Sequence, residues 1–533
     1  MIKIRKVLLL LGFCGFFLSG STAWAKSWYV RSATACANNG DGTASNCATS
    51  AGAAGGWKGF SNIVWGSVVA GDTLNLVTGD TYTGPLLIGS SGSAGNPVTI
   101  TVSGGGTANI DANAGTAINF QSHSYVTLDG VIGSPAFGGS TTMGIAVTNI
   151  GASNYCVYQN GAGADNNKVL HISCHGTSTT SPDDNRGGMY LSGGNGWEVA
   201  YNYIYGDTYP AYSASKWHAT CLSLFRTAQS SASFTDNTAH DNNCTQMYHD
   251  GLRCNGNCSL YHNEVSHIDG SGHADSILIQ SGSYGQIYSN YVHDSGDQNI
   301  YLDNLYDSVC HHIRVYNNII DSNPGHGMNM DPEGAAGTAP ASTGCTGSGA
   351  SGWDDIEFIN NTIYSTSTYG IYWSGRGTVA NLVVLNNIFG TDTTSGYYMA
   401  NLRSSTSVTF TDANSWDYNV YSTSAVSYSR VASWGSSNTY TLAQLQALSP
   451  ARETHGKAGI PTYVNANGAD FHLANSDTVA KGAGVNLYLT YAFLQTDKDG
   501  NSRPSSGSWD IGAYRVATGP QPTPPANLSA TVQ

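Results

Sequence analysis

The sequence contains few charged residues. Asp, Glu, Lys and Arg make up 11% of its 533 residues, and 35 acidic side chains face only 21 basic ones. Proteins that bind nucleic acids need clustered Lys and Arg to neutralise phosphates, so we expect no nucleic-acid partner. An acidic chain would also repel a polyanionic polysaccharide unless a cation bridged the two.

Helix-forming sequence and long apolar runs are also scarce. Stretches rich in Ala, Leu, Glu and Lys at helical spacing are missing, which argues against an α-helical fold. The apolar stretch 7–18 is too short to span a membrane; Lys3, Arg5 and Lys6 precede it and Ala23–Ala25 follows it. This pattern is typical of a secretory signal peptide, so we expect a secreted or cell-surface protein that does not span a membrane.

The cysteines favour disulfides. Of the 11 cysteines, one lies in the signal segment and ten remain, an even number in an exported chain. We expect local pairs Cys36–Cys47 and Cys310–Cys345, and leave the other pairings open. Cys254 and Cys258 have the spacing of half a zinc site, but no second half follows.

What the sequence does contain is glycine (65 residues), tyrosine (32 residues) and many short β-type runs. These runs repeat. An Asn precedes an apolar or β-branched pair at Asn202, Asn237, Asn263, Asn290, Asn318, Asn361, Asn387 and Asn419. A second run begins about half a repeat later, at Gly188, Cys221, Gly251, Ser276, Asn299, Gly327 and Gly370.

The repeats are too short to contain a crossover helix, so they predict a β-solenoid of stacked coils. Inward residues of successive coils then form one continuous core, for example Ile277 and Ile279 above Ile300 and Leu302. The asparagines are expected to stack as a ladder in which each amide bonds the next. The predicted fold is all-β: a single parallel β-helix of about ten coils.

The ladder, the start "AGDTLNLVTGDTYTGPLLIGSSGSAGNPVTITV" (70–102) and the closing "DIGAY" (510–514) resemble the right-handed parallel β-helix proteins of the pectin-lyase-like class. The resemblance covers most of residues 28–515. It implies the fold but no single activity, because the class includes lyases, hydrolases, epimerases and non-catalytic surface proteins.

We divide the chain into a signal peptide (1–25), an N-terminal cap with the first coils (26–115), a β-helix core (116–425), C-terminal coils with a cap (426–516) and a Pro-rich tail (517–533). Short helices are expected within 55–69 and 441–448. The insertion 334–352 is expected to overhang the site described next.

Strand alternation predicts two outward columns on the second run of each repeat. One contains Gln280, Asp303 and Asp331, and the other contains Arg253, Tyr301, Asn329 and Tyr372. Adjacent coils lie about 4.8 Å apart, so Asp303 and Asp331 should be neighbours. Glu333 follows the strand of Asp331, and His273 precedes the strand of Gln280.

These columns support three interpretations. A hydrolase would use the carboxylates of Asp303 and Asp331. A lyase would bind Ca²⁺ through Asp303, Asp331 and Glu333, with Arg253, His273 or Tyr301 as the base. The third interpretation is a solvated face of a non-catalytic surface or matrix scaffold.

We therefore predict a monomer that acts on, or binds, an extracellular polysaccharide. The candidate catalytic residues are Asp303, Asp331, Arg253 and His273. The candidate substrate-binding residues are Tyr301, Asn329, Tyr372 and Gln280. The candidate Ca²⁺ ligands are Asp303, Asp331 and Glu333.

Overall fold

The structure, a computed structural model, describes the following residues: 25–132, 143–151, 154–175, 187–206, 220–225, 236–269, 274–280, 282–303, 311–321, 325–331, 352–366, 369–373, 378–391, 400–402, 408–410, 415–423, 431–434 and 438–516.

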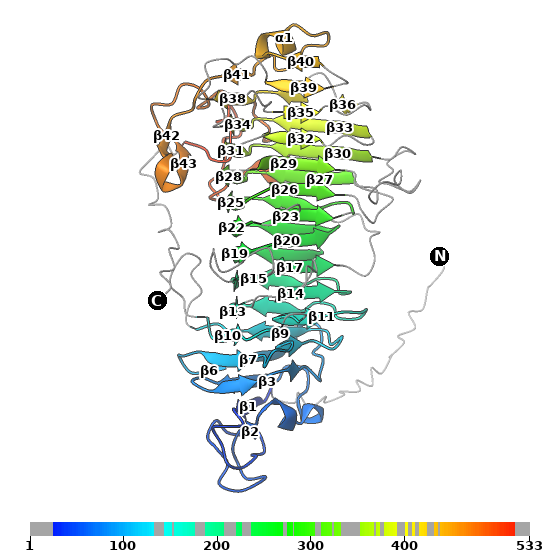
Figure 1. Ribbon diagram of the computed structural model, residues 1–533, viewed down its shortest axis with the longest axis vertical. Helices are drawn as coiled ribbons and strands as arrows, with labels where there is room; N and C mark the ends of the chain where they lie inside the picture. The colour runs from blue at the N-terminus through cyan, green and yellow to red at the C-terminus, as the bar shows by residue number, and fades with distance from the viewer. Residues whose placement is uncertain are drawn as a thin grey trace, which may run out of the picture.

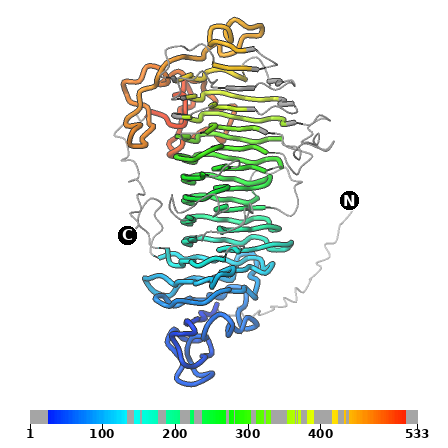
Figure 2. Tube along the Cα trace, viewed as in Figure 1, coloured from blue at the N-terminus to red at the C-terminus, as the bar shows by residue number. Residues whose placement is uncertain are grey.

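Three long sheets run side by side along one axis (Figure 1). Within the described residues they contain 15, 13 and 13 strands, and nearly all neighbours pair in parallel. Each coil adds one strand to each sheet, so the colour changes coil by coil along the axis (Figure 2). The predicted all-β parallel β-helix is confirmed, but sheets 2 and 3 contain 13 strands each, more than the predicted number of about ten coils. The sequence repeats revealed only two of the three strand columns, those of sheets 2 and 3.

Sheet 1 contains β1 (Ser27–Arg31), β2 (Trp57–Lys58), β3 (Thr73–Val77), β6 (Val98–Ser103), β9 (Val126–Asp129), β12 (Lys168–Leu170), β15 (Glu198–Ala200), β18 (Asn237–His240), β21 (Cys258–Tyr261), β24 (Gln286–Tyr288), β27 (His311–Tyr316), β30 (Gly352–Ile359), β33 (Thr378–Leu385), β36 (Val408–Phe410) and β37 (Trp416–Asp417). Sheet 2 contains β4 (Thr81–Thr83), β7 (Ala108–Asp111), β10 (Ile145–Thr148), β13 (Ile172–His175), β16 (Tyr203–Tyr205), β19 (Asn243–Met247), β22 (Glu264–Ile268), β25 (Tyr291–His293), β28 (Ile319–Asp321), β31 (Thr362–Ser365), β34 (Ile388–Thr391), β38 (Val420–Thr423) and β41 (Lys457–Ala458). Sheet 3 contains β5 (Leu86–Leu87), β8 (Ile118–Asn119), β11 (Val157–Gln159), β14 (Gly187–Ser192), β17 (Thr220–Phe225), β20 (Asp250–Asn255), β23 (Asp275–Gln280), β26 (Gln298–Asp303), β29 (His326–Asp331), β32 (Ile371–Trp373), β35 (Ala400–Leu402), β39 (Ala432–Trp434) and β40 (Asn438–Tyr440).

The core lies between the three sheets. Strands near the N-terminus alternate buried and half-buried residues, as in β6, because side chains of a strand point to opposite faces in turn. In sheet 3, by contrast, all six residues of β23 are buried, and so are five of the six residues of β20 and of β26. The outer face of this part of sheet 3 is therefore covered as well.

An asparagine ladder runs along the corner between sheets 1 and 2. Each ladder Asn donates its backbone N–H and its Nδ2 to the Oδ1 of the Asn in the next coil, as Asn263 does to Asn290 at 3.0 Å. Its Nδ2 also donates to a carbonyl oxygen of the preceding coil, which for Asn263 is that of Ala239. The members are buried: Asn202, Asn242, Asn263, Asn290, Asn318, Asn361, Asn387 and Asn419.

One predicted member is wrong. Asn242, not Asn237, occupies the ladder between Asn202 and Asn263. Asn237 lies at the start of a sheet 1 strand, where its Oδ1 accepts from the N–H of Trp197 at 3.0 Å. The two asparagines lie in one repeat and five positions apart, so sequence spacing alone did not separate them.

The ladder coincides with a backbone turn and ends at an acid. The residue before each ladder Asn is left-handed, for example Tyr201 with φ 59° and Ser289 with φ 56°, a conformation that is unfavourable for these residue types. At the last coil Glu453 replaces the next Asn: its carboxylate oxygens accept from Asn419 N–H at 3.2 Å and Asn419 Nδ2 at 2.8 Å. The Tyr421 hydroxyl donates to the same carboxylate at 2.6 Å.

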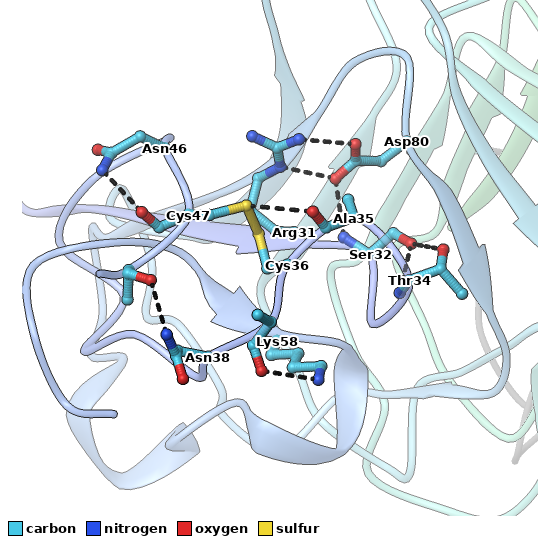
Figure 3. Close-up of a disulfide and its surroundings, with 12 residues drawn as sticks. Arg31, Ser32, Thr34, Ala35, Cys36, Asn38, Asn46, Cys47, Lys58 and Asp80 are labelled. Atoms are coloured by element: carbon cyan, nitrogen blue, oxygen red, sulfur yellow. Dashed lines mark hydrogen bonds and ion pairs between the residues drawn. A yellow bond between two sulfur atoms is a disulfide. The ribbon is translucent and has the colours of Figure 1, made fainter. Parts of the chain in front are cut away.

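The N-terminal cap differs from the predicted helix. Segment 55–69 forms β2 and two short 3₁₀ turns, η1 (Phe60–Asn62) and η2 (Trp65–Ser67), because Gly59 adopts φ 78° and interrupts any helix. Arg31 binds Asp80 through two hydrogen bonds, at 2.8 and 3.0 Å. The predicted disulfide Cys36–Cys47 lies beside this ion pair and is confirmed (Figure 3).

At the other end, α1 (Leu442–Gln446) forms within the predicted segment 441–448, and Thr441 and Gln444 make a capping box at its start. The chain then folds back along the outside of the coils, and the strands β42 (Tyr463–Asn465) and β43 (Asp470–Leu473) lie beside β28 and β31 (Figure 1). This segment also contains η3 (Ala466–Gly468) and η4 (Ala492–Leu494). Asn317 Nδ2 donates to the Thr496 carbonyl at 3.0 Å, which fixes the segment to the coils.

Three further disulfides lie inside the described coils: Cys156–Cys174, Cys221–Cys244 and Cys254–Cys258. They join sheet 3, or the residue before it, to sheet 2 or sheet 1, and their six sulfur-bearing residues are fully buried. The four disulfides of the described residues favour an oxidising compartment. Cys310 and Cys345 lie outside the described residues. No helix in the described ranges is long and apolar enough to cross a membrane.

The ladder yields a first prediction. Asn290→Ala removes the acceptor of Asn263 and leaves buried polar groups in the coils on both sides without partners. We expect the free energy of unfolding to fall by at least about 2 kcal/mol, because each unsatisfied buried group costs about 1–3 kcal/mol. Denaturant unfolding followed by circular dichroism measures it. Asn75→Ala, which removes one half-buried side-chain hydrogen bond, is the control. Equal losses in both variants would contradict a special role of the ladder.

Glu453 yields a second prediction. Burial raises the pKa of its carboxyl from 4.5 to about 7. A raised pKa means that the folded state disfavours the ionised form, so the contribution of Glu453 to stability is full below pH 4.5 and declines as the pH rises through about 7. Glu453→Gln cannot ionise. We expect the stability difference between the wild type and this variant to change across that window; a difference that is constant with pH would contradict the account.

Candidate functional site

The face of sheet 3 that points away from the core carries the residues singled out from the sequence. The strand register aligns Arg253 with Leu278, Tyr301, Asn329 and Tyr372 in successive coils. Their neighbours in sequence fill the hydrophobic core, whereas these five residues do not belong to it. The predicted outward column is therefore confirmed as one row along the solenoid axis.

The two predicted columns are buried rather than solvated at five of their positions, whereas Tyr372 is half-buried. The exposed fraction is 4% for Arg253, 2% for Tyr301, 3% for Asn329, 6% for Gln280 and 3% for Asp303. The interpretation of a solvated polar face is therefore wrong for these coils. Burying a charge without partners is costly, so the arrangement of the charged groups on this face is tightly constrained.

Gln280 connects the arginine to an acid across three coils. Arg253 Nη2 donates to Gln280 Oε1, and Gln280 Nε2 donates to Asp303 Oδ2 at 3.1 Å. The backbone register then pairs Asp303 with Asp331 in the next coil. The structure thus brings Arg253, Gln280 and Asp303 together, although 50 positions separate the first from the last in the sequence.

Two further acids complete this site, and the sequence analysis did not select them. Asp250 and Asp275 begin neighbouring strands, are aligned in register and are 0% and 1% exposed. Arg253 Nη1 lies 3.4 Å from Asp250 Oδ2, and His249 Nδ1 lies 2.9 Å from Asp250 Oδ1. We call Asp250, Asp275, Asp303, Arg253 and Gln280 the acid cluster.

The sequence does contain a signal for these two acids, which was missed: a polar residue recurs at the first position of successive strands of sheet 3. The register continues it from Thr220 through Asp250 and Asp275 to Gln298 and His326. Strict alternation places residues three apart on opposite faces of a strand. The contact between Asp250 and Arg253, which are three residues apart, shows that the start of β20 departs from this rule.

Burial and neighbouring charges change the pKa of Asp275. Burial is the main cause that raises the pKa of Asp275 well above its usual value, and the negative charges of Asp250, Asp297 and Asp303 raise it further. Arg253 acts in the opposite direction. The protonated form of Asp275 is therefore favoured, and its neighbour Asp250 lies beside the guanidinium of Arg253.

Farther along the same row, the polar and aromatic residues interact with each other. Asn329 Nδ2 donates to Gln298 Oε1 at 2.7 Å. The Tyr372 ring lies 4.7 Å from the His326 ring and 4.9 Å from the Tyr369 ring, measured between centroids. Burial lowers the pKa of His326 to about 4, so this imidazole is neutral at pH 7.

Several predicted site residues lie outside the described residues: His273, Glu333, the side chain of Asp331 and most of the insertion 334–352. Within the described part of the chain, no group of three His, Cys, Asp or Glu side chains is placed to hold a metal ion. Ca²⁺ bound by Asp303, Asp331 and Glu333 therefore stays a prediction, and we derive no step through it.

Comparisons with known proteins give structural neighbours only. No protein-family model and no curated protein matches the sequence. A crystal structure of pectate lyase Pel9A is 15% identical with a TM-score of 0.37 and covers 92% of this chain and 96% of its own. The complex of XylC with xylose is 10% identical with a TM-score of 0.47 and covers 92% and 98%.

A third neighbour is a mannuronic acid specific polysaccharide family 6 lyase from human gut microbiota. It is 12% identical with a TM-score of 0.41, and the match covers 75% of this chain and 88% of that one. Similarities at this level concern the fold, and no functional argument is drawn from them.

The acid cluster yields a third prediction. Arg253→Met leaves the buried carboxylates without their guanidinium, and removing one partner of a buried ion pair typically costs about 3–5 kcal/mol. We expect a loss of this size in denaturant unfolding, and partial recovery when Asp250→Asn is added. Lys168→Met, which breaks the half-exposed pair with Glu198, should cost less than about 1 kcal/mol. A similar small loss for Arg253→Met would contradict the arrangement.

Proposed function

We propose that this protein is a secreted glycoside hydrolase that cleaves a polysaccharide lying along the outer face of sheet 3. The observation that carries the proposal is the pairing in register of two buried acids: Asp275, whose raised pKa favours the protonated form, and Asp250, which lies 3.4 Å from Arg253 Nη1. Glycoside hydrolysis requires this combination, because one carboxyl must donate a proton while the other stays ionised.

The general spacing of neighbouring strands is compatible with the same chemistry. Neighbouring strands lie about 4.8 Å apart, and the two carboxyl groups of retaining glycosidases are typically about 5–5.5 Å apart. Asp275 then takes the role of the general acid and Asp250 that of the nucleophile or charge stabiliser. His249, whose side chain is 19% exposed, contacts Asp250.

The charge of the site favours a neutral substrate. The acid cluster contains three carboxyl groups and one guanidinium, and the whole chain carries a net charge of −14. A polyuronate would be repelled from this surface unless a cation such as Ca²⁺ bridged the two. The lyase and the non-catalytic scaffold remain the alternatives, and the first experiment separates all three.

The purified protein is incubated with a soluble xylan, a galactomannan, a β-glucan, polygalacturonate and alginate, each with and without added Ca²⁺. Hydrolysis produces new reducing ends, whereas a lyase produces unsaturated sugars that absorb in the near ultraviolet. We expect reducing ends without ultraviolet absorbance on at least one neutral polysaccharide. Unsaturated products would show that the protein is a lyase and not a hydrolase. The absence of products from all five polysaccharides would favour the non-catalytic scaffold.

The role of Asp275 is tested by substitution. General acid catalysis contributes about 10²–10⁴-fold to a rate, so Asp275→Asn should lower kcat at least about 100-fold on the polysaccharide cleaved in the screen. Asp294→Asn, which changes an acid whose side chain is 66% exposed at the end of a sheet 2 strand, should leave kcat unchanged. Retained activity of a folded Asp275→Asn protein would remove Asp275 from the mechanism.

A further inference from the structure

Four aromatic side chains form a continuous row beside the acid cluster, on its N-terminal side. Tyr158 in β11 and Tyr190 in β14 are aligned in register, and their ring centroids are 5.9 Å apart. Tyr155 packs on both, at 4.7 and 5.4 Å. Phe225 in β17 meets the Tyr190 ring at 5.8 Å.

These rings do not belong to the hydrophobic core. Val157, Met189 and Leu224, from the same three strands, fill the core, whereas the four aromatic residues of the row are half-buried and keep part of their surface accessible. Because residues alternate along a strand, the row occupies the outer face of sheet 3, the face that carries the acid cluster.

The row connects directly to the acid cluster. The guanidinium of Arg253 lies 5.4 Å from the centroid of the Phe225 ring, and the same guanidinium faces Asp250. The contacts therefore continue from β11 through β14 and β17 to β20, along the solenoid axis. A ligand extended along this axis over the half-buried aromatic row would run toward the acid cluster, whose three acids are 0–3% exposed.

We propose that Tyr155, Tyr158, Tyr190 and Phe225 form a binding platform for a neutral polysaccharide chain. The proposal rests on the proposed function, whose substrate lies along the same face. Aromatic rings offer flat apolar area to the C–H faces of sugar rings, and tyrosine hydroxyls offer hydrogen bonds to sugar hydroxyls. None of the four residues is charged, so the platform recognises sugar rings rather than carboxylates.

The platform also bears on the place of cleavage. His326, Tyr369 and Tyr372 form a second group of rings on the C-terminal side of the acid cluster. The cluster thus lies between two groups of aromatic side chains on one face. A chain that contacts both groups crosses the acids with sugars on either side, so cleavage takes place within the chain rather than at its end.

Binding is tested without turnover, in the Asp275→Asn background, by affinity electrophoresis in gels that contain each of the five polysaccharides of the screen. Tyr158→Ala and Tyr190→Ala should each weaken binding of a neutral polysaccharide by up to about 10-fold, the range of an aromatic contact. Tyr158→Phe, which keeps the ring, should retain most of the affinity. The matched control is Tyr205→Ala on sheet 2, where Tyr205 is half-buried and stacked on His175 at 4.6 Å; it should bind as the parent does.

Unchanged binding in both alanine variants, with their circular dichroism spectra intact, would overturn the platform. An equal loss in Tyr205→Ala would also overturn it, because the effect would then be unspecific. If the platform variants lose binding, the platform is supported even where no reducing ends form. The platform proposal and the hydrolase proposal can therefore fail independently of each other. For the active protein, size-exclusion analysis of early products should find chains of intermediate length; early release of mono- or disaccharides alone would contradict internal cleavage.

Discussion

The structure depends on the hydrogen bonds that satisfy the backbone where each coil turns from sheet 1 into sheet 2. Buried N–H and carbonyl groups need partners, and at this corner no β-ladder provides them. An Asn side chain bonds both the coil above and the coil below, while the residue before it adopts the left-handed conformation. This connection keeps neighbouring coils in register, and that register positions every residue on the outer face of sheet 3.

The fold was predictable from the sequence because its coils repeat. The eight ladder positions and the paired apolar residues of sheet 3 recur because stacked coils impose the same environment on each of them. The repeats differ in length, so the spacing between them did not reveal the strands of sheet 1. For the same reason Asn237 was assigned to the ladder in place of Asn242. At the end of the ladder Glu453 takes the place of the next Asn and accepts the hydrogen bonds of Asn419. Because Glu453 does not belong to the sequence repeats, their pattern could not predict this role.

The candidate site was predictable only in part, for a related reason. Alternation correctly aligned Arg253, Tyr301, Asn329 and Tyr372 along one row. It did not reveal that the row is buried, because burial of the outer face depends on what covers a sheet and not on the strand itself. It also passed over Asp250 and Asp275, which lie at the starts of their strands. The strand register brings these two acids together, and Asp250 also lies beside Arg253.

The central claim is that burial and neighbouring acids raise the pKa of Asp275 so that it can act as the general acid beside Asp250. Infrared difference spectra between the wild type and Asp275→Asn at pH 7 test it most directly, since a protonated carboxyl and a carboxylate absorb at different frequencies. The account predicts that the substitution removes a protonated-carboxyl band. Loss of a carboxylate band instead would show that Asp275 is ionised and would contradict its role as the general acid.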